Sequence, residues 1–309
     1  MAFAPYVLNE EALRALPLEA RETVNVIERA LRDVVEGNLH VTPKSVITPG
    51  DGRYVMSTLA SGAMSVAKVV TVSPDNPSRG LPSITGAIMI LDAQTGECLA
   101  LMDAELITAL RTAGLSALAA LSLADPETKV MSFVGAGVQA RAHLDLFCDL
   151  FDLQEILISG RGQANMDALG DLAREKGLCA RICDAPQEAL RADIVVTSIP
   201  ITYSGAAFLD AREMAPNALA IVTDAAKPWI REGRGAFGTV IVDDLEQEAA
   251  MPDPVVAPER MSGDLAGLIS GKVTAGAGPR AFMFRGLGAG DYALAVHLWG
   301  KCQSTSNNV

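Results

Sequence analysis

The feature that most constrains the fold of this chain is a glycine turn that directly follows an apolar segment. Residues 130–134 read Val-Met-Ser-Phe-Val and run into Gly-Ala-Gly-Val-Gln-Ala over residues 135–140. In this Gly-x-Gly-x-x-Ala pattern, Gly135 permits a tight turn, Gly137 lets the backbone approach a pyrophosphate, and the small Ala140 lets the next helix pack on the strand. The pattern predicts a dinucleotide-binding turn with a helix N-terminus facing the phosphates, although an ordinary strand-to-helix turn can carry the same glycines.

The segments around the turn alternate between helical and extended patterns. Residues 141–150 carry apolar side chains at helical spacing, whereas residues 155–159 and 193–198 are short apolar runs typical of buried strands. Alternating strands and helices build a doubly wound parallel sheet, so the predicted fold class is α/β with a Rossmann domain. A long Ala- and Leu-rich helix is predicted over residues 104–123, and Asp-Pro-Glu-Thr at residues 125–128 has the turn residues of a domain junction. The other expected elements are helices over residues 9–14, 21–36 and 291–300, a strand-rich region over residues 44–102 and a glycine-rich stretch over residues 271–290.

Composition narrows the class of function. The chain has 309 residues, half of them hydrophobic, which is enough for two domains and a large core. Its net charge of -12 disfavours nucleic acids and anionic membranes as partners. No apolar run reaches the roughly 18 residues that span a bilayer. The odd number of scattered cysteines, five, suits reduced thiols, so a cytoplasmic protein is expected.

Neither a metal site nor histidine catalysis is predicted. The three histidines, His40, His143 and His297, are scattered and are expected to be structural. Cys179 and Cys183 are close in sequence, but no histidine pair accompanies them. The sequence also contains no Ser-His-Asp set and no Walker loop.

Two cations lie among apolar residues. Lys68 belongs to an otherwise apolar strand pattern, and because an unpaired buried ammonium is costly, it is expected either to reach solvent along its stem or to meet an anion. Arg111 lies among small and apolar neighbours on the predicted helix, where a planar guanidinium suits a bidentate grip on a carboxylate. The alternative for Arg111 is a structural ion pair with Asp103 or Glu105.

The order of short motifs resembles that of the ornithine cyclodeaminase/μ-crystallin family. In that family a strand lysine, an Asn and Gly-Leu-Pro segment, an Asp-x-x-Thr-Gly turn and a Thr-Ala-Leu-Arg-Thr-Ala helix precede a Gly-x-Gly-x-Gln-Ala turn. The resemblance extends over about residues 44–291. The matching segments here are Lys68 and residues 76–82, 92–96, 108–113 and 135–140, in the same order.

This resemblance implies a substrate-binding and dimerisation domain over residues 1–120, completed by a C-terminal helix over residues 285–309. A Rossmann domain over residues 121–284 would be inserted between them and would bind NAD(H) or NADP(H). The activities of the family include cyclodeamination of ornithine or lysine, alanine dehydrogenation, and reduction of imino acids and cyclic ketimines. A homodimer is also expected, because an apolar sheet over residues 83–91 and 98–102 needs covering.

The resemblance further implies roles for individual residues. Lys68 and Arg111 would hold the substrate α-carboxylate, and Lys68 could also polarise or protonate the imine. Asp224 matches the acidic catalytic residue of the family, and a helix cap is its alternative role. The residues predicted to bind the cofactor are Arg111, Thr112, Gly135, Ala136, Gly137, Val138, Gln139, Ser159, Arg161, Thr197 and Ser198.

Two departures from the family pattern concern the substrate. Many relatives have an arginine after a proline, whereas this chain has Pro43-Lys44. Lys44 would therefore contact the substrate carboxylate with a single ammonium group instead of a bidentate guanidinium. Three cations would suit a substrate with two carboxylates. Cyclodeaminases also tend to place a carboxylate on the strand before Lys68 to receive the distal amine, but residues 53–56 read Arg-Tyr-Val-Met and offer none.

Cofactor choice depends on the end of the second Rossmann strand. Residues 158–163 read Ile-Ser-Gly-Arg-Gly-Gln and contain no acid for the ribose hydroxyls of NAD. Ser159 and Arg161 can receive the extra phosphate of NADP, which slightly favours NADPH, although an arginine can also stack on adenine.

Together these features predict an NAD(P)H-dependent reductase of an imino acid, or an amino-acid dehydrogenase working in reverse. Its partner would be a small imino or amino acid such as pyrroline-2-carboxylate, piperideine-2-carboxylate or iminosuccinate. The alternatives are an ornithine- or lysine-type cyclodeaminase, an alanine-type dehydrogenase, and a crystallin-like ligand-binding protein in which the nucleotide is structural.

Overall fold

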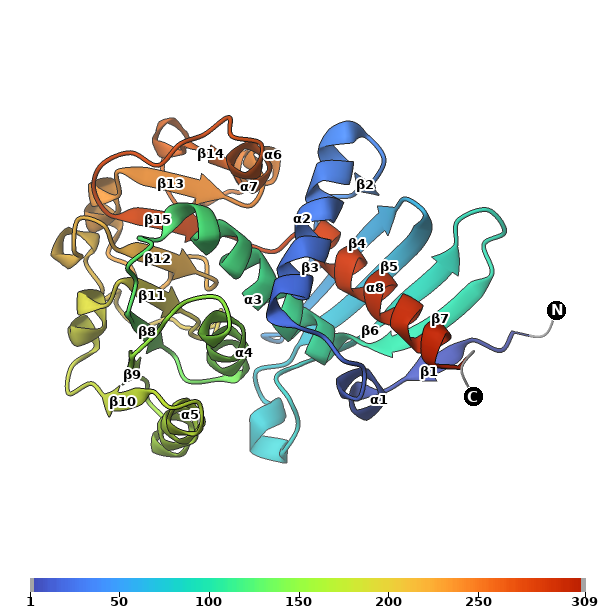
Figure 1. The fold of residues 1–309 in the computed structure, drawn as a ribbon, viewed down its shortest axis with the longest axis horizontal. Helices are drawn as coiled ribbons and strands as arrows, with labels where there is room; N and C mark the ends of the chain where they lie inside the picture. The colour runs from blue at the N-terminus through green and yellow to red at the C-terminus, as the bar shows by residue number, and fades with distance from the viewer. Residues whose placement is uncertain (1–2, 307–309) are drawn as a thin grey trace. The chain divides into compact units, whose positions relative to one another are not determined.

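Two sheets organise this α/β chain, one in each of two units (Figure 1). The computed structural model describes residues 3–306. Unit 1 comprises Met1–Thr112 and Gly286–Val309, and unit 2 comprises Ala113–Arg285. The chain therefore passes from unit 1 into unit 2 and returns to unit 1 for its last segment.

The sheet of unit 1 has seven strands in the order β1-β7-β6-β5-β4-β2, and β3 also pairs with β4. Strands β4 to β7 form an antiparallel meander, and β1 joins β7 in parallel. The strands are β1 (Tyr6–Leu8), β2 (His40–Val41), β3 (Ser45–Ile47), β4 (Tyr54–Ser61), β5 (Met64–Val72), β6 (Ile84–Asp92) and β7 (Cys98–Asp103).

Alternation along these strands gives the sheet two different faces. Val66, Lys68 and Val70 of β5 point to one face and are all buried. Figure 1 shows α2 (Ala20–Glu36) and α8 (Gly288–Ser306) lying across that face. The remaining helical segments of unit 1 are α1 (Glu10–Arg14) and the 3-10 turn η1 (Asn76–Arg79).

The opposite face of this sheet carries an apolar row. Strand pairing aligns Val7, Leu101, Met89, Ala67 and Leu59, in this order, across β1, β7, β6, β5 and β4. Val7 is 74% exposed and Leu59 54% exposed, so the two ends of the row are open to solvent in this chain.

The sheet of unit 2 is parallel and has eight strands in the order β10-β9-β8-β11-β12-β15-β13-β14. Its first five positions follow the Rossmann order, with the switch point between β8 and β11. The predicted α/β class with a doubly wound parallel sheet is thereby confirmed. The strands are β8 (Val130–Val134), β9 (Glu155–Ser159), β10 (Cys179–Ile182), β11 (Ile194–Thr197), β12 (Leu219–Val222), β13 (Thr239–Val242), β14 (Gly263–Asp264) and β15 (Arg280–Met283).

One strand departs from the sequence pattern. The stretch over residues 271–290, expected only to be rich in glycine, contains β15, which lies between β12 and β13. Its register pairs Phe282 with Ile221 on one side and with Ile241 on the other. Four residues are too few to show a period among glycines, so the strand is decided by partners distant in sequence.

Helices cover the sheet of unit 2, and α3 (Ala104–Leu123) contributes its second half to this unit. No membrane-spanning segment was expected from the sequence, yet α3 is long and apolar enough to cross a membrane by length and composition. In the structure, 83% of its apolar window is buried inside the protein. The other helical segments are α4 (Val138–Cys148), α5 (Gln163–Glu175), α6 (Leu245–Ala249), α7 (Leu265–Ile269), η2 (Pro186–Arg191), η3 (Ala211–Glu213), η4 (Arg231–Ala236) and η5 (Pro258–Arg260).

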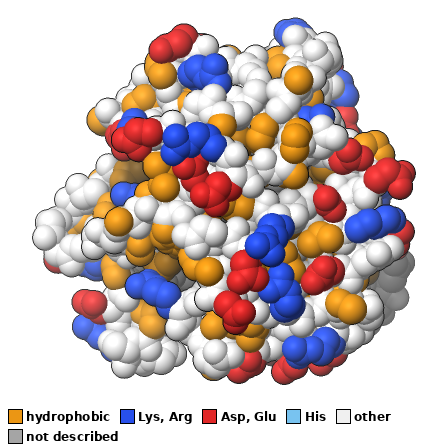
Figure 2. Space-filling view, turned by 90° about the vertical axis from the view of Figure 1, so that its left-hand side faces the viewer, with side chains coloured by type: hydrophobic (Ala, Val, Ile, Leu, Met, Phe, Trp, Pro, Cys, Tyr) orange, Lys and Arg blue, Asp and Glu red, His pale blue; other side chains and the backbone are white. Residues whose placement is uncertain are grey.

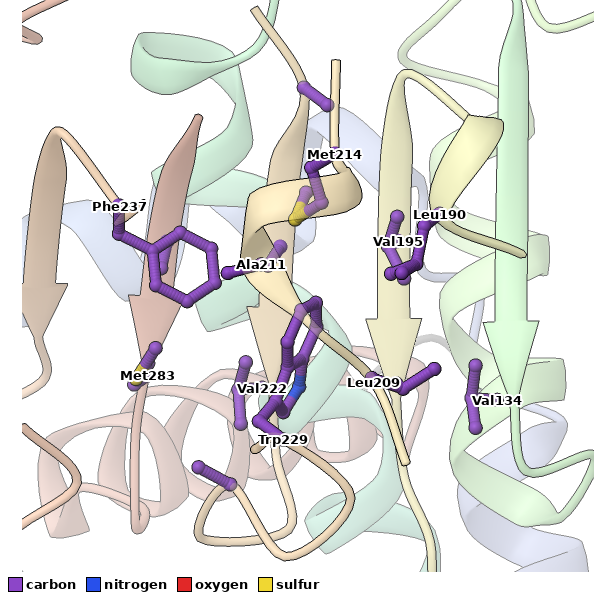
Figure 3. Packing of buried hydrophobic residues seen from close by; sticks show 14 of the residues in the cluster. Val134, Leu190, Val195, Leu209, Ala211, Met214, Val222, Trp229, Phe237 and Met283 are labelled. Atoms are coloured by element: carbon purple, nitrogen blue, oxygen red, sulfur yellow. The ribbon is translucent and has the colours of Figure 1, made fainter. Parts of the chain in front are cut away.

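Aromatic packing fixes the segment that follows β12. The rings of Trp229 and Phe237 lie 5.4 Å apart at 62° and are almost completely buried. Figure 3 shows them among strand residues that include Val222 and Met283. Burying two aromatic side chains stabilises this segment by several kcal/mol, of order 2 to 3 kcal/mol for each.

Charges of both signs share the surface. On the face drawn in Figure 2, basic side chains lie interspersed with acidic and hydrophobic ones. This mixed face does not resemble the continuous basic stripe that binds a phosphate backbone. Within residues 3–306, no group of three or more His, Cys, Asp or Glu side chains is arranged to hold a metal ion.

Candidate active site

Lys68 meets an anion inside unit 1. Its strand, β5, places it between Thr58 of β4 and Ile88 of β6, on the face beneath α8. The ammonium donates a hydrogen bond of 2.7 Å to Oδ1 of Asp291, which lies in the first turn of α8. Both side chains are 4% exposed, so Lys68 pairs with a buried anion instead of reaching solvent along its stem.

Arg111 of α3 pairs with the same carboxylate. Its Nε lies 3.2 Å from Oδ1 of Asp291, and its side chain is 9% exposed. The alternative pairing with Asp103 or Glu105 is not the one formed, because Asp103 instead accepts a hydrogen bond of 2.7 Å from the backbone N–H of Glu105. This contact is an ion pair and not a hydrogen bond, because the buried Nε atom of Arg111 has no hydrogen-bond partner among the described residues.

Lys44 and Arg111 both lie close to Gly286. Gly286 has a φ of +107°, in the region that favours glycine. A Cβ atom built there would lie 2.6 Å from Nη1 of Arg111 and 3.1 Å from Nζ of Lys44. Both cationic groups therefore converge on the bare Cα of Gly286, and a side chain at this position would fill the space where they meet.

Burial and charge act against each other in this cluster. Burial lowers the pKa of Lys68 to about 8, the attraction of Asp291 raises it, and the neighbouring charge of Arg111 lowers it. Burial alone would raise the pKa of Asp291, but Lys68 and Arg111 hold it below its ordinary value. The cluster at neutral pH thus contains an ammonium, a guanidinium and a carboxylate, with Lys44 adding a further positive charge.

The glycine turn of unit 2 has the geometry that a dinucleotide requires. Gly135 has a φ of +103°, and a Cβ there would lie only 2.6 Å from the carbonyl oxygen of Ser198. Gly137 has no atom within 4 Å of its Cβ position, so its backbone is open to approach. The helix α4 begins at the next residue, Val138, and its N-terminus favours an anion.

Two buried polar atoms near this turn have no hydrogen-bond partner among the described residues. They are Oγ of Ser198, which follows β11, and Oε1 of Gln139 in the first turn of α4. Unpartnered buried polar atoms are costly unless a ligand or water satisfies them. Together with the open backbone at Gly137, they make the turn a good fit for the predicted dinucleotide.

His143 lies in α4 and is completely buried. Its Nδ1 donates a hydrogen bond of 2.7 Å to the carbonyl oxygen of Gln139, and its Nε2 lies 2.8 Å from Oγ of Ser116 on α3. Complete burial lowers the pKa of His143 to about 4, so it is neutral at physiological pH. The neutral ring joins the first turn of α4 to α3.

Asp224 lies at the carboxyl end of β12 and is 2% exposed. Its Oδ1 accepts a hydrogen bond from the hydroxyl of Thr197, and its Oδ2 accepts one from the backbone N–H of Ile199. The Thr197 hydroxyl in turn accepts a hydrogen bond of 3.3 Å from the indole N–H of Trp229. Residues 225–228, directly after Asp224, form a turn and not a helix, so the alternative role of a helix cap does not apply.

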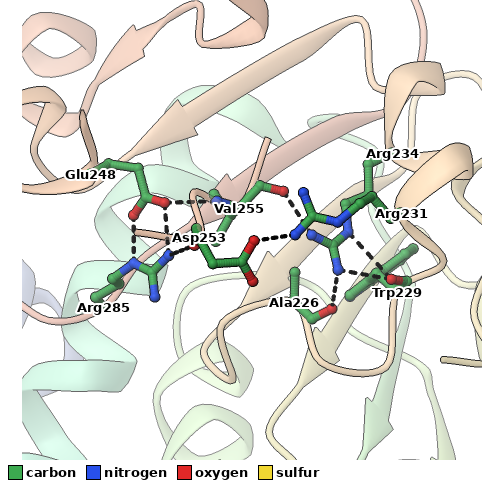
Figure 4. A network of polar contacts seen from close by, with 8 residues as sticks. All are labelled: Ala226, Trp229, Arg231, Arg234, Glu248, Asp253, Val255 and Arg285. Carbon is green, nitrogen blue, oxygen red and sulfur yellow. Dashed lines mark hydrogen bonds and ion pairs between the residues drawn. The ribbon is translucent and has the colours of Figure 1, made fainter. Parts of the chain in front are cut away.

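The turn after Asp224 is strained and is held by Arg234. Ala225 and Ala226 have φ values of 54° and 57°, a left-handed conformation that costs a residue other than glycine about 1 kcal/mol or more. Arg234 donates to the carbonyl oxygens of Ala226, Trp229 and Val255, as Figure 4 shows. The conformation is therefore fixed by a side chain that the sequence patterns did not single out.

The network continues to the end of unit 2 through one largely buried ion pair and one exposed ion pair. Arg285 pairs with Glu248, which is 1% exposed, and also donates a hydrogen bond of 2.8 Å to the carbonyl oxygen of Asp253 (Figure 4). The carboxylate of Asp253 is paired with Arg231. These contacts tie the segment between α6 and η5 to the residue that precedes Gly286.

The end of β9 carries the residues predicted to select the cofactor. The carbonyl oxygen of Ser159 accepts a hydrogen bond of 2.8 Å from the N–H of Gly135, which connects β9 to the glycine turn. The guanidinium of exposed Arg161 lies 5.8 Å from the ring centroid of Tyr203, within cation–π range. Tyr203 had no signal in the sequence, because the loop that carries it follows a different strand, β11.

The predicted site residues thus fall into two sets. Lys44, Lys68 and Arg111 lie together in unit 1, which also contains Thr112. Unit 2 contains Asp224 and the other predicted cofactor-binding residues. Asp291, Gly286, Arg234 and Tyr203 were not predicted, and their contacts depend on residues distant in sequence.

Comparisons with known proteins identify the family of this chain. A sequence model of the ornithine cyclodeaminase/mu-crystallin family matches residues 7–227. The ketimine reductase mu-crystallin of Mus musculus is 30% identical over 206 residues, which are 66% of this chain and 61% of that protein. The chain thus aligns with about three fifths of the length of this relative.

Solved structures of the same fold cover almost the whole chain. The Δ1-pyrroline-2-carboxylate reductase of Thermococcus litoralis, solved with NADH and L-proline, superposes with a TM-score of 0.89 at 22% identity and covers 97% of this chain and 98% of that one. An archaeal alanine dehydrogenase dimer with bound NAD has a TM-score of 0.88 at 24% identity and covers 99% and 97% of the two chains.

Proposed function

Because this chain belongs to the ornithine cyclodeaminase/mu-crystallin family, we propose that it is an NAD(P)H-dependent reductase of imino acids. Its substrate would carry a C=N bond beside a carboxylate, and its product would be an L-amino acid. The observation that carries this proposal is the buried pair of cations, Lys68 and Arg111, which converge on one oxygen of Asp291.

The pair is suited to bind a carboxylate. An ammonium has three N–H donors and a guanidinium has five, so Asp291 does not use all of them. Charge-assisted hydrogen bonds to a carboxylate are stronger than neutral ones, contributing about 1.5 to 3 kcal/mol each. Lys68 and Arg111 are therefore proposed as the ligands of the substrate α-carboxylate.

The glycine turn is proposed to hold the nucleotide. Its phosphates would lie against the open backbone of Gly137 and the N-terminus of α4, and Ser198 and Gln139 offer unpartnered polar atoms. NADH or NADPH, when bound, supplies the hydride for the imine carbon. Arg161 favours NADPH in this proposal, because a guanidinium binds a phosphate well.

The imine nitrogen must gain a proton as its carbon gains the hydride. Lys68 has a pKa of about 8 and is mostly protonated at neutral pH, and Asp224 has a pKa of about 6, close enough to exchange protons there. We propose Asp224 as the proton donor and Lys68 as the cation that polarises the C=N bond.

Lys44 favours a substrate with two carboxylates. It adds a third positive charge beside Arg111 and Gly286, and this charge would attract a second substrate carboxylate, as in iminosuccinate. A cyclic imine with one carboxylate, such as pyrroline-2-carboxylate, is the alternative substrate. A cyclodeaminase is disfavoured because residues 53–56 carry no carboxylate for a distal amine.

The proposal includes a homodimer in the cytoplasm. The apolar row on the open face of the unit 1 sheet provides a surface for a second copy. None of the five cysteines, all within the described residues, forms a disulfide, which suits a reducing compartment.

The test is a steady-state screen of imino acids with NADH and NADPH, repeated with Lys68→Ala and Arg111→Ala. Each substitution is expected to lower kcat/KM about 10- to 150-fold, which corresponds to the loss of about 1.5 to 3 kcal/mol. Lys129→Ala is the matched control, because it removes only a surface ion pair with Asp152. Values near wild type in either site variant would remove that residue from the site.

The same screen separates the rival functions. Ammonia released from ornithine without net consumption of NADH would identify a cyclodeaminase. Bound nucleotide without turnover of any imine would identify a ligand-binding protein instead of an enzyme.

A further inference from the structure

Asp291 occupies an unusual position for an acid. It lies in the first turn of α8 and is 3% exposed, on the side of the unit 1 sheet that carries Val66, Lys68 and Val70. A buried carboxylate is costly unless it is paired and hydrogen-bonded. The N-terminal end of a helix also favours a negative charge, so the fold provides two reasons for an ionised Asp291.

One oxygen of this carboxylate serves both proposed substrate cations. Nζ of Lys68 is 2.7 Å from Oδ1, and Nε of Arg111 is 3.2 Å from the same atom. Without Asp291 the ammonium and the guanidinium would lie close together in a nearly dry site and would repel each other. Lys68 would then lose its proton or move, and the two groups would no longer share one direction.

We propose that Asp291 is a positioning residue, which holds Lys68 and Arg111 beside each other so that their remaining donors can bind one substrate carboxylate. The inference rests on the proposed function, since it assumes that the substrate carries this carboxylate. Asp291 does not contact substrate in this scheme. It acts through the two cations by fixing their direction and by keeping Lys68 charged.

The charged groups that face Asp291 come from several elements. They are Lys68 of β5, Arg111 of α3 and, at longer range, Lys44 just before β3. The strand neighbours of Lys68, Thr58 of β4 and Ile88 of β6, are not titratable in the accessible pH range. Farther along α8, His297 and Lys301 pair with Glu22 of α2 instead.

The test is the pH dependence of kcat/KM for Asp291→Asn, measured with saturating cofactor. This parameter reports groups of the cofactor-bound enzyme and of the free imine, and the imine contributes equally for both enzymes, so a difference in the basic limb reports the enzyme group, proposed as Lys68. In Asp291→Asn the basic limb is expected to move down by about one pH unit, with about a fivefold loss of kcat/KM at about pH 8 and a much smaller loss at about pH 6. An unmoved limb, or an equal loss at every pH, would overturn the inference.

Glu22→Gln is the matched control. It removes an acid that accepts hydrogen bonds from His297 and Lys301 of α8 but does not touch Lys68 or Arg111. The control is expected to lower the melting temperature slightly and to leave the basic limb in place. If it shifts the limb as much as Asp291→Asn does, the effect comes from loosening α8, and the inference fails.

A direct titration separates this inference from the proposed function. In the full chain labelled with ¹³C-lysine, the Lys68 signal is assigned by its absence in Lys68→Ala, and its pKa is expected to fall by about one unit in Asp291→Asn. This readout needs no substrate, so it stands even if no imine is reduced. If Asp291→Asn does not fold, Asp291→Glu replaces it: the retained charge is expected to keep the Lys68 pKa but to raise KM, and an unchanged KM would overturn the positioning role.

Discussion

The hydroxyl of Thr197 donates a hydrogen bond of 3.1 Å to Oδ1 of Asp224, and the backbone N–H of Ile199 lies at the same distance from Oδ2. Complete burial nevertheless dominates and raises the pKa of Asp224 to about 6, although both hydrogen bonds oppose the rise. The carboxyl group can therefore change its protonation state near neutral pH, which is what a proton donor requires.

This pKa predicts the pH dependence of imine reduction. If Asp224 donates the proton, kcat/KM is expected to fall as the pH rises through about 6, and to fall more steeply above about 8, where Lys68 loses its charge. Asp224→Asn should abolish the first step and lower the plateau. Asp210→Asn, which alters an acid paired with Arg212, is the control and should keep both steps. A first step that survives in Asp224→Asn would exclude Asp224 as its source.

Arg234 is expected to contribute more to stability than its neighbour Arg231. Arg234→Ala leaves the carbonyl oxygens of Ala226, Trp229 and Val255 without their donor and releases the left-handed turn, at a cost of about 2 to 3 kcal/mol. Arg231→Ala removes an exposed ion pair with Asp253, which contributes about 0 to 1 kcal/mol. Urea denaturation measures both. Equal free energies of unfolding for the two variants would contradict this account of the turn.

Arg161 is expected to select NADPH. Its guanidinium already lies over the ring of Tyr203, which limits its freedom before a phosphate arrives. Arg161→Ala should raise the Kd of NADPH about tenfold or more and leave that of NADH almost unchanged, as measured by nucleotide fluorescence. Arg212→Ala serves as the control, because this exposed arginine is paired with Asp210. If both nucleotides weaken equally, Arg161 stacks on adenine instead of binding a phosphate.

The open face of the unit 1 sheet predicts a homodimer. Leu59 is 54% exposed and Val69 50% exposed, and β-pairing places Ala67 and Ala87 beside them. Light scattering should give twice the mass of the chain, and Leu59→Glu should give a monomer because it brings a charge into the interface. Leu245→Glu, at an exposed position of α6, should leave the dimer intact. A monomeric wild-type chain at micromolar concentration would refute the prediction.

The third cation predicts the kind of imine that is reduced best. Iminosuccinate, formed in place from oxaloacetate and ammonia, is expected to have a higher kcat/KM than pyrroline-2-carboxylate, because its second carboxylate would be attracted by the positive charge of Lys44 beside Arg111. Lys44→Ala should lower kcat/KM for iminosuccinate by about tenfold and affect the cyclic imine much less. If the cyclic imine is preferred tenfold or more, Lys44 does not bind substrate.

Features that depend on neighbouring residues were readable from the sequence. The glycine turn is one, since both the tight turn at Gly135 and the start of α4 after Gly137 follow from local backbone chemistry. The helix over residues 104–123 and the strand over residues 155–159 also agree with their predicted bounds. The apolar run around Lys68 likewise indicated a strand, but it left open whether the ammonium reaches solvent or meets an anion.

The partners of those residues were decided by the tertiary structure. Lys68 and Asp291 are 223 positions apart, and no local pattern connects a strand lysine to an acid in the last helix. Likewise, β15 lies between β12 and β13 because its backbone pairs in parallel with both strands. Its own four residues show no period that would predict a strand. Sequence periodicity records interactions within a few residues, whereas the pairing of buried charges and strands depends on which distant segments the fold brings together.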